Sequence, residues 1–315
     1  MISFRFHVVS ITAVFLALTI GILVGSTYVD RAIVDNLQSR IDSVSVNLDV
    51  RKAENDALET ELGQAESYIT PSADFAVTDR LTGVPVLVVA MRGIDEAAVA
   101  ESVRLARQAG GVVPGVVWVE PKRDLANEEN LNDMRDAVGG SAGVTPEQLW
   151  KTAWSSIAGE LAQAPAPDLA ASPGQQPGTP LLSALIEAGF LTFDKQGDEA
   201  QEITTLAGRG PRVLVVTGSD LAADISPLVV QANAAGGTVL AEVFTIGAEG
   251  LARGKALSAS LNRETLNRIA IVDNADRTEG QVAAILALAG TPKVIPGHYG
   301  YGPDADAVLP AWTPT

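Results

Sequence analysis

The sequence contains no cysteine, and only two histidines and three methionines occur among its 315 residues. Without a thiol the chain can form no disulfide, no cysteine-based metal site and no cysteine nucleophile. His7 lies near the N-terminus, so His298 is the only imidazole in the rest of the chain. Zinc hydrolases normally need two or three histidines. These absences argue against an enzyme, and we expect no catalytic residue and no resident cofactor.

Basic residues are also scarce. The chain has 22 Lys and Arg against 38 Asp and Glu, a net charge of −16. Such a surface repels nucleic-acid phosphates and anionic lipid head groups. We therefore expect no nucleic-acid partner. Hydrophobic residues make up 47% of the chain, which is enough to build a core without disulfides.

The first feature that is present is an uncharged run from Val8 to Val29. As a helix, a run of this length spans the roughly 30 Å hydrocarbon core of a bilayer. Arg5 precedes the run, and Lys and Arg favour the cytoplasmic side. We predict that residues 1–29 form a cytoplasmic stub and a single-pass anchor in the cell membrane, with the C-terminal domain extracytoplasmic.

A cleaved signal peptide is the alternative, with Val24 and Ser26 as the small residues before the cut. The apolar run is longer than the roughly 7–15 residues of an ordinary signal h-region, and this favours an uncleaved anchor. Ala17, Gly21 and Gly25 follow one another at four-residue spacing. Small residues at this spacing let two membrane helices pack closely, which leaves a homodimer open.

Residues 30–70 follow a heptad repeat that predicts a coiled-coil stalk, roughly 60 Å long as a helix. The apolar spacing alternates three and four from Val34 to Ile69, and Pro71 should end the helix. A lone amphipathic helix folded back on the following domain is the alternative. The residues expected to contact a partner helix are Leu37, Ile41, Val44, Leu48, Asn55, Leu58, Glu59, Leu62 and Glu66.

The charges beside this seam favour a partner of a different kind. In a parallel homodimer Glu54 would face Glu59, and Glu61 would face Glu66, so both pairs would repel by a few tenths of a kcal/mol. Asn55 within the seam favours a dimer in one register at a cost in stability. A basic partner helix would make both contacts attractive. We therefore expect a heterotypic protein partner.

Beyond the stalk, two similar stretches each predict a strand, a helix, an Ala-Gly-Gly stop and a second strand. Apolar strands without alternation are typical of a parallel sheet covered on both faces. We predict an α/β fold with a doubly wound, mostly parallel sheet built from two βαβ halves, residues 71–163 and 181–315. The predicted elements are strands 86–89, 112–119, 213–216 and 238–244, and helices 97–108 and 227–234.

Three further segments complete this prediction. Residues 164–180 are rich in proline and glycine and predict an irregular linker between the halves. A strand over 268–272 and a helix over 279–289 should follow the second half. In the helix expected at 146–163, Trp150 and Trp154 stand four residues apart, where we interpret them as packing residues.

The motifs that could form a ligand-binding or metal site are weak. Residues 217–220 stand where doubly wound sheets place ligands, yet they lack a phosphate-loop motif. We interpret them as a tight turn with Ser219 or Asp220 as N-cap. Asp273, Asp276 and Glu279 are spaced by three, and Asp304 and Asp306 follow His298. These carboxylates could bind a hard cation, but a helix start and a solvated tail explain them better.

Two motifs resemble a known family. The opening stretch Met1–Ser10, with the small and apolar residues through Ser26, and the closing Gly297-His298-Tyr299-Gly300-Tyr301-Gly302 are similar to the mycobacterial copper transport protein B family of actinobacteria. The stalk and the two Ala-Gly-Gly stops are similar as well. The resemblance implies copper export or a pore-like role in the envelope. Members have also been linked to cell-division control, acting with a membrane partner and a peptidoglycan hydrolase.

The residues themselves fit copper chemistry badly. Cu(I) prefers thiolate and thioether ligands, and Cu(II) prefers imidazole. Met91 and Met134 are far apart in sequence, so His298 is the single candidate metal ligand. Paired copies of His298, with Tyr299, Asp304 or Asp306, would be needed to complete a site. We therefore favour a scaffold or regulator of the envelope, with copper transport as the alternative that the resemblance implies.

Overall fold

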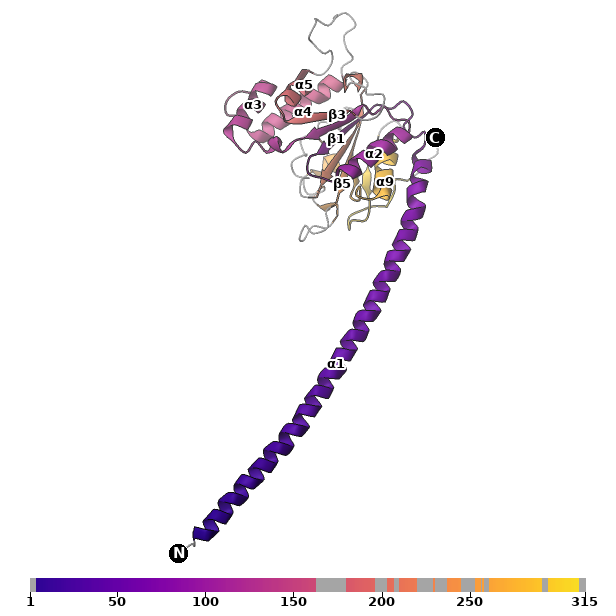
Figure 1. Ribbon diagram of the computed structural model, residues 1–315. Coiled ribbons are helices and arrows are strands. Elements are labelled where there is room, and N and C mark those ends of the chain that lie inside the picture. Colours follow the sequence, from indigo (N-terminus) through magenta and orange to yellow (C-terminus); the bar gives the residue numbers. More distant parts are fainter. Residues whose placement is uncertain are drawn as a thin grey trace, which may run out of the picture. The chain divides into compact units, whose positions relative to one another are not determined.

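The computed structural model describes residues 4–162, 180–195, 203–206, 210–219, 229, 237–244, 253–255, 257, 261–290 and 294–311, with backbone alone for 26–32. The chain divides into two compact units, of which the first ends at Ser67 and the second begins at Tyr68. The first unit is helical, and the second contains a β-sheet with helices on both faces (Figure 1).

Helix α1 runs from Phe4 to Val77 and supplies all of the described first unit. Its stretch Phe4–Gly25 is long and apolar enough to cross a membrane, which fits the predicted single-pass anchor. Beyond the anchor, large apolar side chains from Ile33 to Leu62 are exposed. Residues 30–70 are therefore helical and the described apolar side chains of the heptad seam are exposed, while the coiled coil itself stays a prediction.

The prediction that Pro71 ends this helix is wrong, because α1 continues through Pro71 to Val77. An internal proline removes a backbone donor and crowds the preceding turn, at a cost of about 3 kcal/mol. Ala73 and Val77 are buried in the core of the second unit. Burying one valine contributes about 1.5–3 kcal/mol. Packing of this last part of α1 thus offsets most of the cost of the proline.

The strands of the second unit form one sheet in the order β3-β2-β1-β4-β5-β6-β7 (Figure 1). Neighbouring strands are parallel except β2 and β3, so the predicted mostly parallel α/β class is confirmed. The strands are β1 Val86–Met91, β2 Gly115–Val119, β3 Leu191–Lys195, β4 Arg212–Gly218, β5 Thr238–Val243, β6 Ala270–Val272 and β7 Gly297–Tyr299.

The two predicted halves share this sheet, because β1 pairs directly with β4. The second strand of the first half begins at Gly115 rather than Val112, which forms only an isolated bridge with Pro85. Pro114 lacks the N–H that a ladder needs. The helix predicted at 227–234, except Val229, and the linker 164–180, except Pro180, lie outside the described residues.

Helices cover both faces of the sheet. Helices α2 (Glu96–Gln108) and α9 (Thr278–Leu288) pack on one face, and α3 (Glu128–Val138), α4 (Pro146–Ala162) and α5 (Pro180–Glu187) belong to the core on the other (Figure 1). Each face has its own buried apolar cluster. The short helices are η1 Pro121–Asp124, η2 Ile203–Leu206 and α8 Arg263–Leu266.

Local signals explain two of these helix ends. Asp95 caps α2 by accepting a hydrogen bond from the N–H of Ala97 at 2.9 Å. The Ala-Gly-Gly stop ends α2, where Gly110 adopts a φ of +83°. An added Cβ at Gly110 would lie 2.9 Å from the Cα of Thr82. This stop therefore needs glycine both for its conformation and for the close approach of the chain.

Candidate functional site

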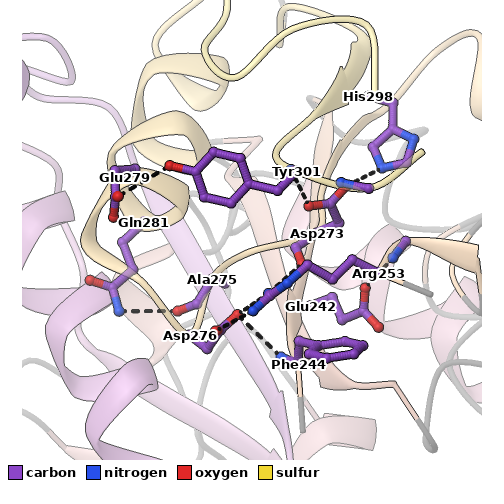
Figure 2. A network of polar contacts seen from close by, with 12 residues as sticks. Glu242, Phe244, Arg253, Asp273, Ala275, Asp276, Glu279, Gln281, His298 and Tyr301 are labelled. Atoms are coloured by element: carbon purple, nitrogen blue, oxygen red, sulfur yellow. Dashed lines mark hydrogen bonds and ion pairs between the residues drawn. The ribbon is translucent and has the colours of Figure 1, made fainter. Parts of the chain in front are cut away.

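The candidate site is a cluster of ionisable side chains near the carboxyl ends of the neighbouring strands β5, β6 and β7. Glu242 lies in β5, Asp273 follows β6 directly, and His298 lies in β7. Because these three strands are parallel neighbours, their carboxyl ends meet at one edge of the sheet. Arg253 and Asp276 join them from the segments that follow β5 and β6 (Figure 2). We call these five residues the carboxyl-end cluster.

Asp273 is fully buried, and both of its carboxylate oxygens are hydrogen-bonded. Its Oδ1 accepts from the N–H of Tyr301 at 2.8 Å, and its Oδ2 accepts from the N–H of Gly302 at 2.8 Å and from His298 Nε2 at 2.9 Å. Burial opposes its charge, but these donors outweigh burial and lower the pKa of Asp273. Asp273 therefore stays ionised and fixes the proton of His298 on Nε2.

The glycines of the closing segment, residues 297–302, allow it to wrap around Asp273. Gly300 has a φ of +132°, and an added Cβ there would collide with Asp273 Oδ1. An added Cβ at Gly302 would lie 2.5 Å from Asp273 Oδ2. The glycine-rich motif is thus needed because backbone N–H groups must approach a buried carboxylate.

Arg253 forms an ion pair with Asp276, apart from the Asp273–His298 hydrogen bond. Its Nη1 lies 2.6 Å from Asp276 Oδ1 and its Nη2 3.0 Å from Asp276 Oδ2, a bidentate arrangement. Its guanidinium group lies over the ring of Phe244, 4.4 Å from the centroid, and its Nη1 also donates to the carbonyl oxygen of Asp273. The arginine is therefore already engaged by Asp276 rather than by Glu242.

Glu242 is the unusual member of the cluster. It is fully buried, and its Oε2 accepts from the N–H of Gly254 at 2.6 Å. Among the described residues, Oε1 has no hydrogen-bond partner, and neither has Ser219 Oγ beside it. Burial raises the pKa of Glu242 and outweighs the interactions with Ser219 and Gly254, which lower it; the nearby charge of Asp273 adds a smaller upward effect, and Arg253 opposes it.

The sequence placed some of these residues correctly and missed others. The sequence singles out His298, Asp273 and Asp276 as possible metal ligands, although it favours a helix start for the two acids. Glu242 and Arg253 were missed, although a carboxylate inside the apolar strand 238–244 was a usable signal. Asp220 lies outside the described residues. Ser219, which follows β4, is buried, and its N-cap role stays a prediction.

The three spaced acids do not converge on one point. Asp273 binds His298, Asp276 binds Arg253, and Glu279 accepts from the hydroxyl of Tyr301 at 3.1 Å (Figure 2). Within the described ranges, no group of three or more His, Asp or Glu side chains is arranged to hold a metal ion. Each acid thus has a protein partner of its own.

The oxygen atoms predicted to join His298 in a metal site, those of Tyr299, Asp304 and Asp306, make other contacts or face solvent. The Tyr299 hydroxyl donates to the carbonyl of Pro296 at 3.0 Å, and Asp306 accepts from the backbone N–H of His298 at 3.0 Å. Asp304 is exposed. A surface pocket of about 340 Å³ is lined by His298 and Asp306 among others. Within one chain, His298 is therefore a hydrogen-bond partner of Asp273.

A second polar cluster lies after β1 and β2. Arg92 Nη2 lies 3.0 Å from Glu120 Oε1, its Nη1 lies 2.8 Å from Glu96, and its guanidinium stacks 4.3 Å from the Trp118 ring centroid. Burial raises the pKa of Glu120, but hydrogen bonds from Arg92 and Thr192 outweigh it, so the net shift is downward. This cluster is half-buried and leaves no unpaired acid among these residues.

The partner and membrane residues predicted from the sequence lie on α1. The seam residues Leu37, Ile41, Val44, Leu48, Leu58 and Leu62 are all exposed in the single chain, as are Asn55, Glu59 and Glu66. Gly21 and Gly25 have open space around them. Trp150 and Trp154, in contrast, are buried and stacked with centroids 5.6 Å apart, which confirms their packing role.

Comparisons with known proteins agree on one family. The family described as "Copper transport outer membrane protein, MctB" matches residues 1–310. The chain is similar to the copper transporter MctB of Mycobacterium bovis and of Mycobacterium tuberculosis, each 27% identical over 330 residues, covering 98% of this chain and 99% of the relative. The copper transporter MctB of Mycobacterium leprae is 26% identical over 331 residues with the same coverage.

Proposed function

This chain belongs to the family of the copper transport outer membrane protein MctB, and on that premise we propose that it is a non-enzymatic, single-pass envelope protein that holds a partner protein through its stalk. The anchor residues 4–25 would fix it in the cell membrane, with Arg5 on the cytoplasmic side and the α/β domain outside. The partner would bind the heptad seam of α1 as a coiled coil.

The exposed seam is the single observation that carries this proposal. Leu48 is 64% exposed and Ile41 is 59% exposed, and their neighbours along the seam are similarly open. Contiguous apolar surface of this kind marks an interaction site in a soluble segment. The residues of the second unit show the opposite pattern, with a buried apolar core on each face of the sheet. Among the described residues, the stalk therefore exposes a row of large apolar side chains, whereas those of the sheet and its covering helices are mostly buried.

The charges beside the seam suggest which partner this would be. Among the described residues, Glu59 and Glu66 make no ion pair, whereas Arg51 pairs with Glu54 at 3.4 Å on the surface of the helix. In a homodimer the acidic flanks of two copies would face one another. A partner helix with an apolar seam and basic flanks would remove the repulsion, so we propose a heterotypic partner.

The test reverses the two acidic flanks. The double variant Glu59→Lys/Glu66→Lys should self-associate more tightly than wild type, because both facing pairs become attractive, by a few tenths of a kcal/mol per pair. Sedimentation of the full chain in detergent measures this. The matched control is Asp49→Lys/Asp56→Lys, which makes the same charge change at positions away from the seam. A wild-type chain that is a tight dimer and is weakened by the first variant would contradict the proposal.

Copper handling is the second candidate, because the relatives are named copper transporters. One observation favours testing it: His298 and Asp306 line the same surface pocket. Two copies of the chain could bring two such pairs together as nitrogen and oxygen ligands for Cu(II). Titration of Cu(II) into the full chain and into His298→Ala decides between the candidates. We expect no binding tighter than micromolar, and tight binding lost in the variant would establish the copper role.

A further inference from the structure

Buried polar atoms without partners gather at the carboxyl ends of the central strands. Ser219 follows β4, Glu242 lies near the end of β5, and Asn274 follows β6; all three side chains are at least 97% buried. Ser219 Oγ, Glu242 Oε1 and both polar atoms of the Asn274 amide lack a hydrogen-bond partner among the described residues. Buried polar groups are almost always paired, and each exception requires an explanation.

The two buried acids of this edge have opposite surroundings. Asp273 accepts three hydrogen bonds, one of them from His298. Glu242 accepts one, from Gly254. The charged groups of the described residues that face Glu242 are Asp273 from β6, which repels its charge, and Arg253 from the following turn, which is held by Asp276. His298 in β7 reaches this site only through Asp273 and the close contact at Gly254.

A neutral Glu242 fits this end of the cluster better than an ionised one, because its carboxyl group is fully buried, receives one hydrogen bond from Gly254 and lies near the ionised Asp273. The Ser219 hydroxyl lies near enough to Glu242 to act on its titration, although neither Oε1 nor Oγ makes a hydrogen bond of good geometry. A neutral carboxylic acid has one O–H donor and one carbonyl acceptor. Its O–H could donate to Ser219 Oγ, while its carbonyl keeps the N–H of Gly254. An ionised Glu242 could also accept from the Ser219 hydroxyl, but it would place a second buried negative charge near Asp273.

We propose that Glu242 is a proton-binding site, neutral in the folded domain, and that its proton keeps the Arg253–Gly254 turn and the closing segment attached at this edge of the sheet. Gly254 is the link between them. It donates to Glu242, and its Cα stands so close to the His298 ring and to Asp273 that an added Cβ would contact both. Loss of the proton would place a second buried charge at this edge, and opening of the turn together with the closing segment would let water reach it. This inference does not depend on the proposed function of the stalk.

The sign of the pH dependence follows from the direction of the shift. The pKa of Glu242 is raised from its ordinary value of 4.5, so the folded edge binds a proton that the opened edge releases. Its stabilisation is complete below 4.5 and is lost as the pH rises through the folded pKa. Within that window, opening of the edge should become about tenfold more frequent per pH unit. Asp273 has the opposite shift and acts only below its ordinary value of 3.8.

Hydrogen exchange of the full chain in detergent tests this, with rates corrected for the intrinsic pH dependence of exchange. The reporters are the N–H groups of Gly254, Tyr301 and Gly302, which donate to the two buried acids. Wild-type protection should fall as the pH rises above 4.5. Glu242→Gln keeps an acceptor and a donor without a titrating proton, so its protection should stay constant.

Glu160→Gln is the matched control, because burial also raises the pKa of Glu160, which lies in α4 and accepts from the N–H of Leu181. It should leave the pH profile of the three reporters unchanged. Difference infrared spectra give a second measurement, in which the wild type should show a protonated carboxylic acid that titrates and is absent in Glu242→Gln. A wild-type exchange profile that is flat above pH 4.5, or an equal profile in Glu242→Gln, would overturn the proposal.

Discussion

The same residue types are exposed to solvent in the stalk and buried in the α/β domain. Leu48 in the stalk is 64% exposed, whereas Leu214 in β4 is fully buried. Glu59 and Glu66 face solvent, whereas Glu242 is enclosed at the end of β5. In the domain the apolar side chains pack against one another, while those of the stalk seam are exposed.

This contrast shows which region still has exposed apolar surface that a partner could bury. Burial of a leucine is worth about 1.5–3 kcal/mol, and the domain has already realised this gain. The stalk can realise it only against a second helix. We therefore expect substitutions in the domain to change folding, and substitutions in the stalk to change association. The following variants test that division, beginning with the largest expected effect.

Asp273→Asn should be the most damaging single change. An amide keeps one acceptor, so it cannot receive N–H donors on both sides, and His298 loses its charged partner. Leaving a buried donor without its acceptor costs about 1–3 kcal/mol for each group, and more where the lost acceptor is charged. Urea unfolding of the full chain in detergent measures the loss. Glu264→Gln, which breaks an exposed pair with Arg268, is the control and should change stability by less than about 1 kcal/mol. A similar small effect for Asp273→Asn would show that the closing segment is held by other contacts.

Leucine-to-alanine substitutions in the two regions make the comparison directly. Leu214→Ala removes a fully buried side chain and should cost about 2–5 kcal/mol in the free energy of unfolding of the domain. Leu48→Ala, at an exposed seam position, should cost less than about 0.5 kcal/mol in the same measurement. Leu48→Ala should instead weaken any association measured by sedimentation. Equal losses of stability from both would mean that the stalk already packs against something within the chain.

Gly300→Ala tests how closely the closing segment approaches Asp273. The left-handed backbone at Gly300 costs a side chain about 1–2 kcal/mol, and the collision with Asp273 Oδ1 adds to it. Gly139→Ala is the matched control, since Gly139 has a φ of +70° and open space around its Cα. Gly300→Ala should therefore lower the thermal midpoint more than Gly139→Ala. An equal effect of the two would show that backbone strain alone matters.

The sequence predicted the regular elements because their signals are local. The uncharged run 8–29 required a helix able to span a bilayer, the apolar strands required a covered parallel sheet, and Trp150 and Trp154 were placed in the core. The end of α1 was misplaced because Pro71 is a local signal that burial of Ala73 and Val77 overrides. The candidate site was only half foreseen, since the partners of Asp273 come from segments more than 20 residues away.

The residues alone thus determined the apolar helix that is long enough to cross a membrane, the heptad pattern, the absence of thiol chemistry and the α/β class, because hydrophobic period, charge and composition act along the chain. Only the tertiary structure decided that β1 joins β4 in one sheet, that the closing glycines wrap Asp273, and that Glu242 is enclosed beside it. These features depend on which segments meet in space. The pKa of a carboxyl group and the need for a glycine are set by those neighbours.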